Sequence, residues 1–128
     1  MRAFHWNVQG KDFFDLHEKF EELYNQFQTN IDDLAERLGV LGLFPISNLT
    51  EMISKSEIQQ NDNKISGEAM VREVISDLET IIGLQVEIVE QAQSNGDIST
   101  AQLAIDELKK IEKTHWMLTS WINVHPNQ

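Results

Sequence analysis

The chain of 128 residues contains no cysteine, which excludes disulfide bridges and metal sites built from thiolates. Without disulfides, a cytoplasmic location is the default expectation. The sequence also lacks any run of about 18 apolar residues, so no membrane-spanning helix is predicted. Its opening residues, MRAFHWNVQG, do not contain the apolar core of a signal peptide.

Basic residues are scarce: 10 lysines and arginines stand against 21 aspartates and glutamates, which gives a net charge of −11. No Lys/Arg-rich tail is present, and this much negative charge disfavours direct binding to the phosphate backbone of DNA. The same charge would draw small cations toward an acidic surface or cavity. Catalytic nucleophile arrangements, phosphate-binding loops and zinc-finger spacings are absent as well.

Proline occurs only at positions 45 and 126, so long helices can run with little interruption. Apolar residues recur three and four positions apart, which is typical of amphipathic helices and predicts an all-α fold in one domain over residues 1–128. Expected helices occupy residues 12–39, 47–54, 66–94 and 99–122, while residues 1–9 look like the end of a first helix cut off by the start of the sequence.

Local signals mark the expected ends of these helices. Ser47 or Asn48 would cap the short helix, and Asn95 with Gly96 would supply a left-handed stop for the helix before them. Ser99 with Gln102 resembles a capping box that starts the last helix.

Other expectations concern the apolar stripes and the connections. Ile31 and Val86 are each assigned to the apolar stripe of their helix because they fit its spacing, and Met117 contributes to the apolar character of the last helix. Residues 59–63 are expected to form a polar loop, and His125 is expected to face solvent.

Four side chains in the helix expected over 12–39 carry most of the functional information: His17, Glu21, Asp32 and Glu36. They fall within an arc of about 100° around the helix, beside the apolar stripe, and all are of metal-ligand type. Glu21 and Asp32 nevertheless lie about 16 Å apart along the axis, at the usual rise per residue. One helix therefore cannot close all four around a single metal ion.

The same four positions are symmetric about a point between residues 26 and 27. Two copies packed antiparallel about a two-fold axis there would set His17 opposite Glu36 and Glu21 opposite Asp32. An isologous dimer has this symmetry. The spacing therefore predicts two equivalent metal sites, each shared between two subunits.

His5 could join this set. It precedes His17 by twelve positions, and a turn at Gly10 would let the two rings approach each other. Imidazole nitrogen suits iron or zinc, and carboxylate oxygen suits iron and harder ions. A lone histidine more often has a structural role, whereas the whole set favours a metal site.

Other candidates have plainer interpretations. Glu112 and His115 form the one Glu-x-x-His motif, but a di-iron site within one bundle needs two such motifs and two further glutamates, so a helix-surface pair is favoured. Trp6, beside His5, either packs or stands near a redox metal, and both interpretations stay open. Trp116, Met117 and Trp121 are expected in the core or an interface.

A resemblance to the Dps family, the mini-ferritins also called DNA-binding proteins from starved cells, lies in HWNVQGKDFFDLHEKFEELYNQF and the following IDDLAERLGVLG. It is dense over residues 4–42 and continues through the helix lengths and the terminal HWML segment. It implies a ferritin-like four-helix bundle with a short helix in its middle connection and most of the first helix missing. It also implies a homo-oligomeric shell of twelve subunits built from two-fold dimers.

The resemblance further implies a ferroxidase and iron-storage protein that protects the cell from oxidative damage. Iron(II) would be oxidised, preferentially by hydrogen peroxide, at sites shared between two-fold-related subunits, and stored as a ferric mineral. By position, the metal ligands would be His5, His17 and Glu21 of one subunit with Asp32 and Glu36 of its mate.

Several details qualify the resemblance. Position 21 is commonly aspartate in the family, so Glu21 is one methylene longer, while Trp6 matches the tryptophan beside the site. Acidic pores would lie near Asp97 and Asp106. Members that bind DNA often use lysine-rich tails, and none is present here. The alternatives are a non-catalytic, nucleoid-associated protein that protects DNA and an inert helical assembly whose ligands are vestigial or hold zinc.

Overall fold

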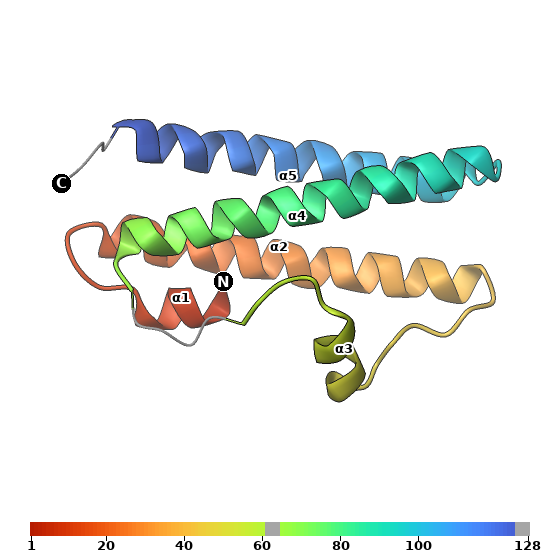
Figure 1. Cartoon of the computed structure of the whole chain (residues 1–128), viewed down its shortest axis with the longest axis horizontal. Coiled ribbons are helices and arrows are strands. Elements are labelled where there is room, and N and C mark those ends of the chain that lie inside the picture. Colours follow the sequence, from red (N-terminus) through yellow and green to blue (C-terminus); the bar gives the residue numbers. More distant parts are fainter. Residues whose placement is uncertain (61–64, 125–128) are drawn as a thin grey trace. The chain divides into compact units, whose positions relative to one another are not determined.

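The computed structural model of the chain describes residues 1–60 and 65–124, which contain five α-helices and no strand (Figure 1). The all-α class expected from the sequence is therefore confirmed. The chain divides into two compact units, Met1–Gly67 and Glu68–Gln128, so its expected organisation as one domain stays a prediction. Within the described residues, no helix combines the length and hydropathy needed to cross a membrane. Most of the loop expected over 59–63, and His125, fall outside the described residues.

The first unit begins with a short helix that folds back on a long one. Helix α1 spans Arg2–Asn7 and helix α2 spans Phe13–Val40. The chain reverses at Gly10, whose φ of +101° is a left-handed conformation that glycine adopts without steric cost. As a result α1 lies against the first turns of α2 (Figure 1). The ring centroids of Phe4 and Phe20 are 5.7 Å apart at this contact.

The buried face of α2 follows alternating steps of three and four residues. Leu16, Phe20 and Leu23 are no more than 3% exposed. The stripe then continues to Asn30, which is 6% exposed, and not to Ile31, which is 57% exposed. The assignment of Ile31 to the core was wrong because either residue fits the apolar spacing. The Nδ2 atom of Asn30 has no hydrogen-bond partner among the described residues.

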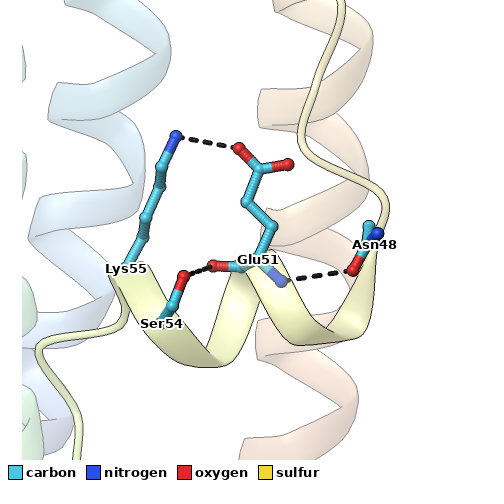
Figure 2. Close-up of polar contacts among 4 residues, drawn as sticks. All are labelled: Asn48, Glu51, Ser54 and Lys55. Atoms are coloured by element: carbon cyan, nitrogen blue, oxygen red, sulfur yellow. Dashed lines mark hydrogen bonds and ion pairs between the residues drawn. The ribbon is translucent and has the colours of Figure 1, made fainter.

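Helix α3, Leu49–Lys55, lies in the connection that follows α2 and is capped at its N-terminus (Figure 2). Asn48, one of the two predicted caps, accepts a hydrogen bond on Oδ1 from the backbone N–H of Glu51 at 3.2 Å. Lys55 pairs with the Glu51 carboxylate at 2.9 Å, and Ser54 donates to the Glu51 carbonyl. These local bonds hold a helix that has no buried residue.

The second unit is an antiparallel pair, α4 (Gly67–Ser94) and α5 (Ile98–Val124). The left-handed stop expected after α4 is present at Gly96, whose φ is +72°. Asp97 N–H bonds to the Ala92 carbonyl at 2.8 Å and Gly96 N–H bonds to the Gln93 carbonyl at 3.1 Å, which is a Schellman ending.

Asp97 also begins α5. Its Oδ1 accepts from the backbone N–H of Thr100 at 3.1 Å, and its Oδ2 accepts from the Thr100 hydroxyl. The capping box expected from Ser99 and Gln102 is therefore wrong. Because Gly96 ends α4 directly before it, Asp97 occupies the N-cap position of α5, and its carboxylate accepts from a free N–H group of the first turn. Ser99 lies inside the helix, where it cannot act as the N-cap.

The buried positions of α4 repeat every seven residues, and one of them is occupied by a polar residue. Val71, Leu78, Gln85 and Ala92 are each seven residues apart and all are buried. Gln85 takes the inward position and donates from Nε2 to Oε2 of the buried Glu107 at 3.0 Å. The apolar Val86, next to Gln85, is consequently 38% exposed, so its assignment to the stripe was wrong.

On α5 the same spacing buries Ala104, Ile111 and Leu118. Met117 precedes Leu118 and is 43% exposed, so it does not lie in the core of this unit, and its place in an interface stays a prediction.

Candidate metal centre

The contact between α1 and α2 brings two of the predicted ligands together. The imidazole rings of His5 and His17 stack with centroids 3.9 Å apart and planes inclined by 18°. Each ring also bonds to the backbone of the other residue: His5 Nδ1 lies 2.7 Å from the His17 carbonyl oxygen, and His17 Nδ1 lies 2.8 Å from that of His5. The predicted approach of the two histidines is therefore confirmed.

These reciprocal bonds define which nitrogen carries the proton. A carbonyl oxygen can only accept, so both Nδ1 atoms must donate. In the neutral ring the remaining nitrogen, Nε2, then keeps its lone pair. Metal-binding histidines are commonly oriented by such a bond from the other ring nitrogen to a carbonyl. His5 and His17 are thus chemically suited to bind a metal ion through Nε2.

Aromatic side chains enclose the pair. Phe13 stacks on His17 with centroids 4.9 Å apart, and Tyr24 meets His5 edge-on at 5.5 Å. Arg2 in turn lies over the Tyr24 ring, with its guanidinium carbon 5.2 Å from the centroid. His5 itself is only 8% exposed. These contacts limit rotation of both imidazoles. Tyr24 is a site neighbour that sequence reasoning missed, although its position one turn past Phe20 places it near the histidines.

The predicted carboxylates are on the same helix but do not converge on the histidines. The side chains of Glu21, Asp32 and Glu36 are exposed and form no hydrogen bond or ion pair within the described residues. Glu21 lies one helical turn after His17. In residues 1–60 and 65–124, no three His, Cys, Asp or Glu side chains gather closely enough to hold a metal ion. One chain therefore brings together two of the five predicted ligands.

Trp6 is only partly covered by its own chain, with 69% of its surface exposed. Most of the ring therefore has no packing partner among the described residues of one subunit. The interpretation of Trp6 as a group close to the metal stays a prediction.

The remaining candidates have other contacts. His115 does not pair with Glu112; its Nε2 instead lies 3.1 Å from Oε1 of Glu79 on α4. Asp106 accepts from Gln102 at 2.9 Å, and Asp97 caps α5. Sequence reasoning missed the contact with Glu79 because the two residues are 36 positions apart and no local pattern joins them.

The donor set fits iron chemically. Two imidazole nitrogens and three carboxylates combine a ligand suited to iron and zinc with ligands suited to iron and harder ions. The acidic composition of the chain would also raise the local concentration of cations.

Comparison with known proteins gives a consistent family. Residues 1–126 match the family model of the ferritin-like domain. General stress protein 20U of Bacillus subtilis is 40% identical over 122 residues, which are 95% of this chain and 84% of that protein. DNA protection during starvation protein 2 of Bacillus anthracis is 38% identical over 96% of this chain and 84% of its own length.

Solved structures agree. A Dps protein from Vibrio cholerae, described as a member of a broad superfamily of ferritin-like diiron-carboxylate proteins, has a TM-score of 0.92 at 36% identity and covers 94% of this chain and 76% of that one. Dps from Staphylococcus aureus gives 0.91 at 36% identity, covering 94% of this chain and 80% of its own. The ferritin-like fold expected from the sequence is confirmed, and the chain belongs to the Dps family of ferritin-like proteins.

Proposed function

We propose that this protein oxidises iron(II) and stores the product, and that each oxidation site is shared between two subunits. The observation that carries the proposal is the reciprocal bonding of His5 and His17, which leaves both Nε2 lone pairs for a metal ion. Membership of a family that includes a diiron-carboxylate Dps protein supports it. Iron is the substrate and cargo in this proposal.

A second copy would complete the ligand set. The positions of His17 and Glu36, and of Glu21 and Asp32, are symmetric about the middle of α2. An antiparallel partner helix would therefore bring its own Asp32 and Glu36 to the histidines of the first subunit. At the second site, Asp32 and Glu36 of the first subunit would meet the histidines of the partner.

An exposed aromatic residue on α2 supports such a partner. Phe14 lies on the same face of α2 as His17, three residues before it, and is 82% exposed. Apolar surface beside the predicted ligands would be covered by the second copy. The further proposal is a shell of twelve subunits in the cytoplasm, assembled from these dimers.

The chemistry follows from the ligands and the oxidant. Carboxylates stabilise iron(III) over iron(II) because the higher charge interacts more strongly with anionic oxygen. Hydrogen peroxide takes up two electrons as its O–O bond breaks, and two neighbouring irons supply one each. The products are two iron(III) ions and two hydroxide ions, with no hydroxyl radical released. Removing iron(II) and peroxide together would protect the cell from oxidative damage.

The direct test measures iron(II) oxidation by peroxide, followed by the absorbance of iron(III). We expect the double variant His17→Ala with Asp32→Ala to lose the protein-catalysed phase. Asp33→Asn, which changes the exposed carboxylate beside Asp32, is the matched control and should oxidise iron at the native rate. Equal rates for the double variant and the native chain would contradict the proposal.

A second variant separates metal binding from folding. Asparagine at position 17 keeps a donor close to the place of Nδ1 but has no atom at the place of Nε2. His17→Asn should therefore keep the contact between α1 and α2, and native helicity, while losing iron oxidation.

Sharing between subunits can be tested by complementation. His17→Ala and Asp32→Ala variants are each inactive if every site needs both residues. In a mixed dimer, one site lacks both groups and the other has both. Refolding an equal mixture should then restore roughly a quarter of the native sites, from random pairing of the two variants. A site built within one chain would recover nothing on mixing.

A further inference from the structure

A pair of metal-ligand side chains, His115 and Glu79, lies between α4 and α5, within one compact unit of the chain. It borders an open cavity of about 340 Å³. Arg72, Ser76 and Glu79 line it from α4, spaced along one helical face, and His115 and Thr119 line it from α5. None of these residues belongs to the iron site proposed above.

The polar groups at this cavity include a nitrogen and an oxygen at metal-binding separation. His115 Nε2 and Glu79 Oε1 are 3.1 Å apart. Two ligands bound to one tetrahedral ion lie roughly 3.3 Å apart, given metal–ligand distances near 2.0–2.1 Å. An ion could therefore replace the hydrogen bond between them at nearly the same separation, once the side chains rotate to aim Nε2 and the carboxylate at the ion and the Nε2 proton passes to solvent.

A hydroxyl group nearby is available for further contacts. The Oγ1 atom of Thr119 is buried and has no hydrogen-bond partner in the described part of the chain. It lies on the same wall of the cavity as His115, one helical turn later. Its lone pairs can accept from a water bound to the ion.

Arg72 is the one lysine or arginine among the described residues that line the cavity, and its contacts favour a cationic ligand over an anionic one. Its Nε and Nη2 atoms donate to Oε1 of Glu68 at 3.0 and 2.7 Å, so its charge is already offset by a carboxylate. Glu79 would repel an anion entering the cavity. The net charge of −11 likewise attracts cations to the chain.

We propose that His115 and Glu79 form a second, open site for a first-row divalent transition metal ion. Two protein ligands leave the remaining positions to water, so bound ions exchange readily. Imidazole with carboxylate accepts iron(II), zinc or cobalt(II).

Cobalt(II) is the probe for the test, because it binds at zinc-type and iron-type sites. The full chain carries His17→Ala with Asp32→Ala, so that binding at the proposed iron site does not contribute. Equilibrium dialysis followed by metal analysis counts the bound ions. We expect one saturable cobalt ion per chain, and affinity at least tenfold lower, roughly the scale of losing metal-site contacts, in His115→Gln and in Glu79→Gln. Both amides can keep a hydrogen bond between the helices.

Two further variants make the test specific. Glu73→Gln, an exposed carboxylate of α4 outside the cavity, should leave cobalt binding unchanged. Arg72→Gln should leave it unchanged or tighten it, because a like charge is removed.

Crystals grown with cobalt(II) should show anomalous scattering between His115 Nε2 and Glu79. Native-like cobalt binding by His115→Gln would overturn the proposal, as would the absence of that anomalous signal. Saturable binding of inorganic phosphate that is lost in Arg72→Gln would also overturn it, in favour of an anion site. Because the native ligands of the proposed iron site are absent, failure here leaves the proposed function standing.

Discussion

Asp77, on α4, carries a carboxyl group that the fold makes harder to ionise. Burial raises the pKa of Asp77 above its ordinary value of 3.8, and the negative charge of Glu73, one turn earlier, raises it further. The folded state therefore holds the Asp77 proton to higher pH than the unfolded chain does. Stability falls as pH rises from about the unfolded pKa through the raised folded pKa.

Replacing this carboxyl by a neutral amide should remove that pH dependence. We expect Asp77→Asn to have a larger free energy of unfolding than the native chain at neutral pH. The difference should shrink as the pH falls toward 3.8, where the native carboxyl is protonated in the folded state. Urea unfolding across this range checks the prediction, and a constant difference between the two chains would contradict it.

His5 and His17 show how much of the site could be predicted at this scale. Residue type and spacing identified both rings, and the turn at Gly10 made their approach possible. The exchange of hydrogen bonds between each Nδ1 and the other backbone could not be predicted, because it depends on ring rotation and on the position of a carbonyl.

At the scale of elements, Asp97 stabilises both helix ends at the junction between α4 and α5. Its backbone completes the ending of α4, and its side chain caps α5. Asp97→Ala should therefore lower the free energy of unfolding by about 1 kcal/mol, the usual loss for an N-cap. Ser99→Ala is the matched control and should change stability little. Urea denaturation of both variants distinguishes the observed cap from the one expected from sequence, since a larger loss in Ser99→Ala would reverse the assignment.

Helix type and approximate extent follow from apolar spacing because burial along a helix repeats every three or four residues. Spacing alone does not decide between neighbouring positions. Asn30 is buried beside the exposed Ile31, and Gln85 beside the exposed Val86, because heptad register outweighs hydropathy there. The buried bond from Gln85 to Glu107 shows what register allows: a polar pair can occupy the core when its members reach each other.

At the scale of the whole molecule, the connection after α2 exposes a large amount of apolar surface. Phe44 is 98% exposed, and Val40, Leu41, Leu43 and Leu49 are each at least 45% exposed. Apolar surface of this kind is typical of protein–protein contacts. It supports the proposed homo-oligomer, whose partner contacts cannot be derived from a single sequence.

Phe44→Ser tests this surface without disturbing the subunit. Because almost the whole Phe44 side chain is exposed, the change should leave the helicity of the chain intact. We expect the particle mass, measured by light scattering during size-exclusion chromatography, to fall toward that of smaller species. An unchanged mass would remove Phe44 from the proposed interface.

The net charge of −11 makes a separate prediction about DNA. Relatives of this chain are named for DNA protection, yet phosphate contacts need lysine or arginine and this chain has few. We expect the 128-residue chain to leave duplex DNA unshifted in a gel assay at low salt. A retarded band would favour direct coating of DNA over protection through removal of iron and peroxide.

The exchange of hydrogen bonds between His5 and His17 makes the six-residue helix α1 matter beyond the one ligand it carries. If a protease trimmed α1, the ring of His17 would lose the His5 carbonyl that accepts the hydrogen bond from its Nδ1–H. That proton could then sit on either nitrogen, and the ring could turn. Damage to the amino terminus would thus weaken a ligand that lies outside the clipped segment.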